Sequence, residues 1–283
     1  MKKWNLIVDV AECTNCKNCF IACKDEYVDN EIEGYSAPQP LHGHKWINIV
    51  KKERGRYPLV DVAYVPTMCN HCDDAPCVEQ GGGAVSKRQD GIVIIDPVKA
   101  KGNRALVDSC PYGAIWWNDE HQVPQAWPFD AHLLDQGWEH PRCVQSCPTG
   151  ALKACKVSDE EMAIVVREDN LQTLHPDYAT KPRVYYKNLE RFTKLFVAGE
   201  VLIKSENSLD CSSGATVRLL ANTNQVAVTK TDDFGEFMLD GLEPNSGEFQ
   251  LEVTADGMRK QTVDLVMLDQ CIALESIVLQ AGA

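Results

Sequence analysis

The 283-residue sequence lacks features that define several large classes of protein. It has no run of about eighteen or more apolar residues, which a membrane-spanning helix needs. It has no excess of basic residues, because the formal net charge is −13, whereas nucleic-acid binding selects basic faces. The sequence therefore predicts no membrane span of its own and no nucleic-acid partner.

The N-terminus also lacks a secretory signal. Its basic start is followed by a short apolar run that Asp9 interrupts, and no small-residue cleavage site comes next. We interpret residues 1–10 as a first β-strand and expect a cytoplasmic protein. A partner that carries an export signal for both chains is the alternative, and the presence of a membrane-anchor subunit is left open.

Cysteine is what the sequence has in excess. Of its 13 cysteines, 11 lie between Cys13 and Cys155, and only Cys211 and Cys271 lie beyond. Dense disulfide scaffolds are typical of small secreted domains, and this chain is long. The spacing favours metal ligands instead, while Cys211 and Cys271 are interpreted as packed or loop thiols.

The first motif is Cys13-x2-Cys16-x2-Cys19-x3-Cys23, the spacing of bacterial ferredoxins. The first three thiolates, on one tight loop, can bind three irons of a cubane cluster, and the fourth reaches another cluster. Lys24 stands where a proline is usual. A zinc-binding interaction module is the alternative, but zinc needs only four ligands and usually shows two separated cysteine pairs.

A second loop, Cys69-x2-Cys72-x4-Cys77, and two cysteine–proline ends supply the remaining ligands. A proline after the cysteine fixes φ and ends the preceding turn, which aims the thiolate. Because ferredoxin ligands cross over along the chain, we predict two [4Fe–4S] clusters. The first is assigned to Cys13, Cys16, Cys19 and Cys147, and the second to Cys69, Cys72, Cys77 and Cys110.

Cys23 and Cys143 are half of a third ligand set. Where a Cys-x2-Cys would complete it, the chain has Trp127-Pro-Phe-Asp130. Asp130 could bind iron through oxygen and His132 through nitrogen. The alternative is an empty position whose volume Trp127 fills, so a third, degenerate cluster is left open.

Two further residues of the cysteine-rich part are not included in these ligand sets. Cys155 is interpreted as a buried thiol, and a role as a spare ligand is the alternative. His71, inside the second loop, is interpreted as a supporting residue that does not bind metal. Near Gly81, where a fourth cluster would need ligands, the chain offers none.

The chain divides by pattern at residues 181–195, a connector. Residues 1–180 are rich in Cys, Pro and Gly, with a strand-like run at 91–96 and a helix predicted over 159–168. The sequence predicts an α+β fold: a ferredoxin-like iron–sulfur domain, then a small antiparallel β-sandwich of immunoglobulin-like type over 196–283. Period-two alternation predicts its seven strands at 196–204, 215–221, 225–231, 236–239, 249–254, 261–268 and 272–279.

The order of these motifs resembles the ferredoxin subunit of the dimethyl sulfoxide reductase family of molybdenum enzymes. It is most similar to one branch: the small subunits of pyrogallol–phloroglucinol transhydroxylase and of related aromatic hydroxylases and dehydroxylases. The resemblance includes the C-terminal β-domain. Besides the cysteine motifs, it is carried by residues 43–48, 53–58, 90–97, 110–113, 131–135, 181–189 and 233–237.

The resemblance implies an iron–sulfur subunit without an active site of its own. It implies a heterodimer, or multiples of one, with a large catalytic partner that holds molybdenum with two pyranopterin guanine dinucleotides and acts on phenolic rings. It also implies a departure at Trp127 and Asp130, where the branch carries cysteines. Whether the clusters transfer electrons or only stabilise the fold is left open.

Overall fold

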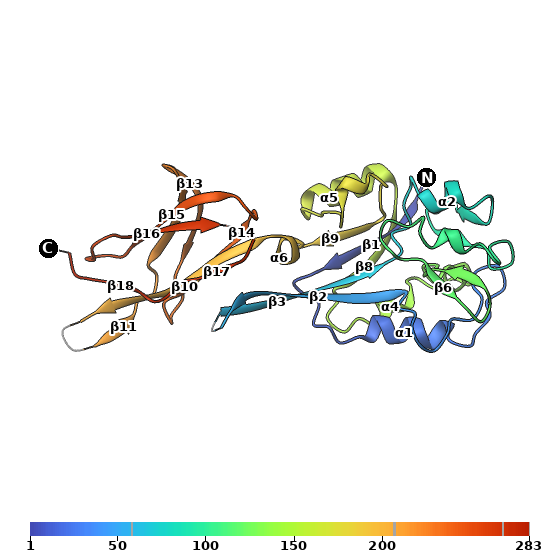
Figure 1. Ribbon diagram of the computed structural model, residues 1–283, viewed down its shortest axis with the longest axis horizontal. Coiled ribbons are helices and arrows are strands. Elements are labelled where there is room, and N and C mark those ends of the chain that lie inside the picture. The colour runs from blue at the N-terminus through green and yellow to red at the C-terminus, as the bar shows by residue number, and fades with distance from the viewer. Residues whose placement is uncertain (58, 206–207, 268, 283) are drawn as a thin grey trace. The chain divides into compact units, whose positions relative to one another are not determined.

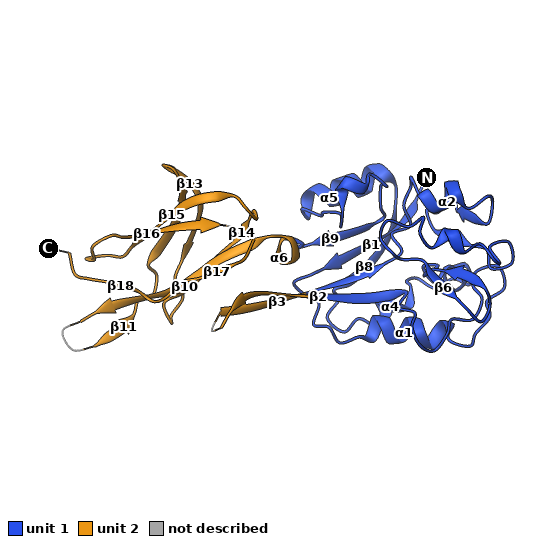
Figure 2. Ribbon diagram, in the orientation of Figure 1, with its two compact units in different colours: residues 1–51, 64–189 blue, residues 52–63, 190–283 orange. Residues whose placement is uncertain are grey.

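The computed structural model describes residues 1–57, 59–205, 208–267 and 269–282 (Figure 1). Pro58 and Leu268, which end two of the segments named above, lie outside the described residues. The chain forms two compact units. Unit 1 comprises residues 1–51 and 64–189, and unit 2 comprises residues 52–63 and 190–283 (Figure 2).

Unit 1 contains a three-stranded sheet with β1 (Lys3–Asp9) at its centre. β1 pairs antiparallel with β8 (Leu152–Val157) and parallel with β9 (Val184–Lys187). The strand predicted at the N-terminus is therefore confirmed. The other strands of this part form the hairpins β2 (Ile47–Arg56) with β3 (Leu59–Met68), β4 (Val85–Lys87) with β5 (Val93–Ile95), and β6 (Trp116–Asn118) with β7 (Val123–Gln125).

The helices of unit 1 are short and connect these strands. None of the helices in the described ranges has the length and apolar character needed to cross a membrane. The longest of them are α1 and α5, and the helices that lie between these two in the sequence are about one turn long. The helices are α1 (Asn18–Tyr27), α2 (Pro76–Gln80), α3 (Ala131–Asp135), α4 (Arg142–Gln145) and α5 (Asp159–Glu168), with 3-10 turns η1 (Arg104–Leu106) and η2 (Pro176–Tyr178).

α5 is the helix predicted over 159–168, and its bounds are confirmed. The Ser158 side chain accepts a hydrogen bond from the Glu161 N–H, while the Glu161 side chain accepts one from the Ser158 N–H. This reciprocal cap satisfies two backbone donors, and three acidic residues in the first turn complement the helix dipole. Local sequence alone is therefore enough to specify where this helix begins.

Unit 2 is a two-sheet β-sandwich that follows the short helix α6 (Glu190–Thr193). Alternate residues such as Val217, Leu219, Leu251 and Val253 are fully buried between the sheets. One sheet has the order β13-β12-β15-β16, and the other is built on β10. The strands are β10 (Leu195–Lys204), β11 (Leu209–Cys211), β12 (Thr216–Ala221), β13 (Asn224–Lys230), β14 (Glu236–Leu242), β15 (Gly247–Thr254), β16 (Gln261–Met267), β17 (Ile272–Ala273) and β18 (Ile277–Leu279).

The alternation of the sequence located these strands well. Each of the seven expected segments coincides with a strand, except that the last is divided into β17 and β18, and β11 was not expected. Most pairings are antiparallel, but β17 and β18 run parallel to β10. The reason is that the chain crosses over from β16, in the other sheet, before it runs beside β10.

Residues 52–63, the tip of the β2–β3 hairpin, belong to unit 2. Arg54 is 3 % exposed, and its guanidinium donates to the carboxylates of Asp61 and Asp240 and to the carbonyl of Lys194. Gly55 has a φ of 80°, and a Cβ there would lie 2.3 Å from the Leu59 carbonyl oxygen. Unit 2 is therefore assembled from two separate stretches of the chain.

Candidate iron–sulfur sites

The first ligand loop precedes α1 and enters its first turn. Asn15 and Lys17 have left-handed φ values of 59° and 67°, which fold the loop tightly between its cysteines. Cys147 follows α4, which packs against α1, and the Asn18 side chain donates to the Ser146 carbonyl at 3.2 Å. Two segments far apart in sequence are thereby held together at this group of thiols.

The four thiols assigned to the first cluster lie close enough to act on one another electrostatically. The pKa of Cys19 is raised to about 12, mainly by burial and in smaller part by the nearby Cys13, Cys16 and Cys147. Burial likewise raises the pKa of Cys13, with Cys147 and Cys16 adding to the effect. The structure thus places these four cysteines near one another, as a shared cluster would require.

The second ligand loop follows β3 and ends in α2. Cys69, Cys72, Cys77 and Cys110 all line one cavity, whose walls are otherwise mostly apolar and include Val93, Ile95, Ile115 and Ala126. Apolar walls exclude water, as is usual around a cofactor site. The four cysteines predicted for the second cluster therefore share one largely dry space.

Thiolate charges on these four cysteines would be unfavourable in this cavity without a cation. The pKa of Cys77 is raised to about 11, mainly by burial and in smaller part by Cys110 and Cys72. Burial also raises the pKa of Cys69 well above its ordinary value, and Cys110 and Cys77 add to this. A coordinated metal removes that penalty because its charge stabilises the thiolate. The donor set of four soft sulfurs fits an iron–sulfur cluster.

Among the described residues, no group of three or more His, Cys, Asp or Glu side chains is arranged to hold a single metal ion. In a cubane cluster each thiolate binds a different iron, so its four ligand sulfurs do not converge on one ion. Four thiols around a shared cavity are compatible with that kind of ligation.

Comparison with known proteins agrees with this chemistry. The family described as a 4Fe-4S dicluster domain matches residues 60–170, and the family described as a carboxypeptidase regulatory-like domain matches residues 197–279. The pyrogallol hydroxytransferase small subunit of Pelobacter acidigallici is 45 % identical over 95 % of this chain and 96 % of the relative. The chain belongs to the family of that small subunit.

Other relatives with lower identity to this chain are subunits of reductases. A tetrathionate reductase subunit of Salmonella typhimurium is 30 % identical over 66 % of this chain and 73 % of the relative. The arsenate respiratory reductase iron-sulfur subunit of a Shewanella species is 26 % identical over 64 % of this chain and 94 % of the relative. The predicted resemblance, the fold class and the assignment as a non-catalytic iron–sulfur subunit are confirmed.

At the third position, Asp130 is 1 % exposed, and its carboxylate is already engaged by protein donors. Its carboxylate accepts hydrogen bonds from the Tyr27 hydroxyl at 2.8 Å, the Trp127 indole at 2.9 Å and the Arg142 N–H at 2.8 Å. Burial raises the pKa of Asp130, and these donors offset only part of that rise. The carboxylate joins α1, α4 and the 127–130 loop.

Cys23 and Cys143 are buried near Asp130. Burial raises the pKa of both thiols well above the ordinary value, and the Asp130 charge is the next contributor for each. His132, the other candidate ligand, has its Nε2 at 2.7 Å from the Glu26 carboxylate. The structure thus gathers the residues of the doubtful third site, but two of them have protein partners already.

Aromatic side chains occupy the volume beside this network. Trp127 is fully buried, and its ring centroid lies 4.9 Å from that of Phe129. The His71 ring packs edge-on against both, at 5.8 Å and 5.3 Å. Burial lowers the pKa of His71 to about 3, and the neutral ring accepts the Val93 N–H at Nδ1. These contacts match the supporting role predicted for His71.

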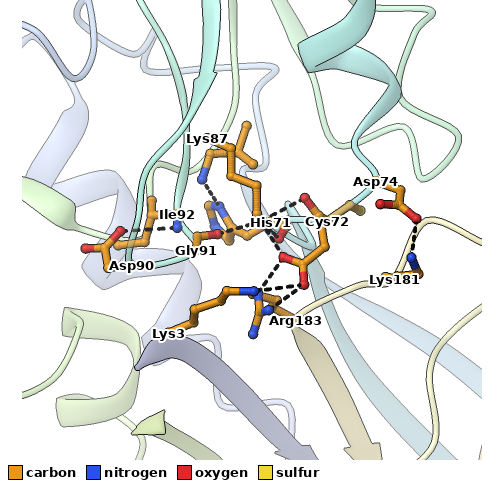
Figure 3. Close-up of polar contacts among 12 residues, drawn as sticks. Lys3, His71, Cys72, Asp74, Lys87, Asp90, Gly91, Ile92, Lys181 and Arg183 are labelled. Atoms are coloured by element: carbon orange, nitrogen blue, oxygen red, sulfur yellow. Dashed lines mark hydrogen bonds and ion pairs between the residues drawn. The ribbon is translucent and has the colours of Figure 1, made fainter. Parts of the chain in front are cut away.

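Lys87 is a contributor to the second site that the sequence did not reveal (Figure 3). Its ammonium lies 2.9 Å from the His71 carbonyl oxygen, 2.8 Å from that of Cys72 and 3.0 Å from that of Gly91. It also pairs with the Asp73 carboxylate at 2.9 Å. Lys87 thereby fixes the backbone of the second ligand loop. A single lysine in a three-residue strand carries no motif that would have identified it.

The three remaining cysteines lie apart from these groups. Cys155 lies on β8 opposite Asn5, Cys271 accepts the Phe196 N–H at 3.4 Å, and Cys211 is exposed on β11. Cys211 is thus a surface thiol, not a packed one.

Replacing Cys211 with alanine should leave the iron content unchanged. The side chain is exposed in unit 2, whereas both proposed ligand sets lie in unit 1. Iron and protein are measured on the same purified sample, with the wild-type protein as reference. A loss of iron from Cys211→Ala would show that the ligand assignment is wrong.

Proposed function

We propose that this chain is the iron–sulfur subunit of a molybdenum enzyme that acts on phenolic rings in the cytoplasm. A large partner subunit carries the active site and holds molybdenum with two pyranopterin guanine dinucleotides. The identity of 45 % over 95 % of the chain, which extends through the β-sandwich, carries this proposal. The relative's name specifies pyrogallol, a trihydroxybenzene, as the kind of substrate.

Two [4Fe–4S] clusters are assigned to this subunit. Cys13, Cys16, Cys19 and Cys147 hold the first, which is supported by the mutual effects of these thiols on their pKa values. Cys69, Cys72, Cys77 and Cys110 hold the second, which is supported by the cavity that they share. When bound, such clusters supply one-electron redox chemistry and cross-link the loops that ligate them.

No third cluster is assigned. Asp130 accepts three hydrogen bonds from protein donors, and Trp127 and Phe129 are buried against each other beside it. A cluster would have to displace these rings and leave their polar partners unsatisfied. Cys23 and Cys143 are interpreted as buried thiols that persist from a lost ligand set.

Metal analysis of the purified complex tests the proposal. We expect about eight irons per chain, together with molybdenum on a co-purifying large subunit. The complex should transfer a hydroxyl group between phenolic rings, assayed by chromatography of the products with no external electron acceptor added. Substantial zinc with no iron would support an interaction module instead. A chain that purifies without a molybdenum partner would contradict the assignment.

The alternative to electron transfer is a purely structural role for the clusters. This role is favoured because no cluster is assigned to the third position. Transfer of a hydroxyl between two rings needs no net electron input, so such an enzyme does not depend on a continuous series of clusters. Reductive titration monitored by paramagnetic resonance distinguishes the two roles. Clusters that substrate reoxidises take part in turnover, whereas clusters that stay silent throughout turnover are structural.

A further inference from the structure

The Lys87 ammonium lies against the backbone of a proposed cluster ligand. The carbonyl oxygens of His71 and Cys72 are 2.9 Å and 2.8 Å from its Nζ atom, and Gly91 supplies a third carbonyl oxygen at 3.0 Å (Figure 3). The Lys87 side chain is 19 % exposed. A cation is therefore held beside the second ligand loop in a largely buried position.

Lys87 reaches the second site through its charge. It is not among the residues that line the cavity shared by the four cysteines, so it does not act by contact with a ligand sulfur. Water screens a charge only weakly where both the charge and its target are buried or partly buried. The carbonyl that Lys87 contacts and the thiol that would bind iron both belong to Cys72. The ammonium is thus close enough to act on a cluster held by that thiol.

Asp73 brings a negative charge to the same side of the loop. Its carboxylate pairs with Lys87 at 2.9 Å and with Lys3 at 3.5 Å, and it accepts a hydrogen bond from the Arg183 Nε at 2.7 Å. Arg183 and Lys3 each also pair with Asp159 at 2.8 Å, but the Asp159 side chain is 54 % exposed. Of these five side chains, three are cations and two are carboxylates, and the more exposed carboxylate is the more screened.

Gly91 allows these cations to lie so close together. Its φ is 88°, and a Cβ there would lie 3.0 Å from the Arg183 Cδ and 3.1 Å from the Lys3 Cβ. Its carbonyl oxygen accepts a hydrogen bond from Lys87. A larger residue would be strained in this left-handed conformation and would press on both neighbouring cations. The backbone at this position is therefore part of what places positive charge beside the ligand loop.

Residues 180–183 hold the second ligand loop independently of Lys87. Three backbone hydrogen bonds join this segment to residues on both sides of Cys72, and none of the three involves the Lys87 side chain. The loop should therefore keep its place when that side chain is replaced. The bonds run from the Asp73 N–H to the Lys181 carbonyl at 2.9 Å, from the Asp74 N–H to the Thr180 carbonyl at 3.1 Å, and from the Arg183 N–H to the Asn70 carbonyl at 2.8 Å.

We propose that the Lys87 ammonium raises the reduction potential of the second cluster and that the Asp73 carboxylate lowers it. This inference rests on the proposed cluster ligation. On reduction the cluster takes one electron from the titrant and gains one unit of negative charge, while no bond forms or breaks. A fixed cation nearby stabilises that added charge, and a nearby carboxylate destabilises it. The two residues should therefore move the potential in opposite directions.

The test is a redox titration of the purified complex monitored by paramagnetic resonance. The second-cluster signal is identified as the one that Cys77→Ala abolishes. Lys87→Met removes the charge and should disfavour reduction of that cluster about tenfold, a fall of ~59 mV for one electron. Lys87→Arg, which keeps the charge, should titrate close to the wild type. The matched control Lys230→Met, at an exposed position in unit 2, should leave the potentials of both clusters unchanged.

Asp73→Asn separates an effect of charge from a loss of structure. The amide has nearly the shape of the carboxylate but no negative charge, so this variant should raise the same potential. A loosened ligand loop gives no reason for opposite shifts in the two variants. An unchanged potential in Lys87→Met, an equal fall in Lys87→Arg or a fall in Asp73→Asn would overturn the proposal.

Loss of the cluster from a variant does not prevent a decision. If Lys87→Met retains no second cluster, Asp73→Asn decides alone: a higher potential supports the proposal, and any other result overturns it. A wild-type complex without iron would refute the ligation itself, before any variant is compared.

Discussion

Cys16→Ala should lower the iron content of the subunit from about eight to about four irons per chain. Cys16 is exposed, so its replacement removes little packing and the loss can be attributed to ligation. Without it, three thiols remain for a cubane that takes four. The measurement is iron per folded chain in the purified complex, combined with the loss of one of two cluster signals.

Cys211→Ala is the matched control, because it makes the same change at another exposed cysteine. A product with about seven irons and a three-iron signal would still identify Cys16 as a ligand. Full retention of eight irons in Cys16→Ala would contradict the assignment of the first cluster.

Asp130→Ala should destabilise the subunit strongly without removing iron. The substitution leaves the Tyr27 hydroxyl, the Trp127 indole N–H and the Arg142 N–H without their acceptor. Each buried unsatisfied group costs about 1–3 kcal/mol, so the three groups together cost roughly 3–9 kcal/mol. That is a large part of the ~5–15 kcal/mol that holds a typical domain folded. Thermal and urea unfolding of the complex measure the change.

Asp130→Asn should have a smaller effect, because the donors divide between the two carboxylate oxygens. Tyr27 and Trp127 donate to Oδ1, which an amide oxygen can replace, while Arg142 donates to Oδ2, which would become an NH₂ group. Asp177→Ala, at an exposed aspartate, serves as the control. If Asp130→Ala instead removed about four irons and left the stability unchanged, Asp130 would be a cluster ligand.

Local pattern predicted much of the fold. The reciprocal cap at Ser158 and the alternation of β12 and β15 are properties of neighbouring residues, so a sequence window contains them. The grouping of the cysteines was also predicted from spacing, because the distance between ligands along the chain is a local property of the sequence. The replacement of a Cys-x2-Cys by Trp127 and Asp130 is likewise visible in the sequence. It indicated that Trp127 could fill the volume of the third cluster position.

Other features depend on tertiary placement and could not be predicted. Thr180 and Lys181 meet the second ligand loop only because backbone hydrogen bonds join segments that are distant in the chain. Lys87 binds carbonyl groups, which every residue has, so no side-chain motif reveals its target. Asp130 was considered as an iron ligand because its three hydrogen-bond donors cannot be recognised in the sequence. These donors come from α1, α4 and its own loop, and they meet only in the folded protein.

A stop codon after residue 189 would not excise the sandwich cleanly. The tip at 52–63 would remain in the truncated product, and its Arg54 would lose Asp240 and the Lys194 carbonyl. A chimera with another family member would have to exchange 52–63 and 190–283 together to keep that charge paired. The linear division that we propose, 1–180 and 196–283 with a connector at 181–195, therefore does not by itself define a fragment that can be produced alone.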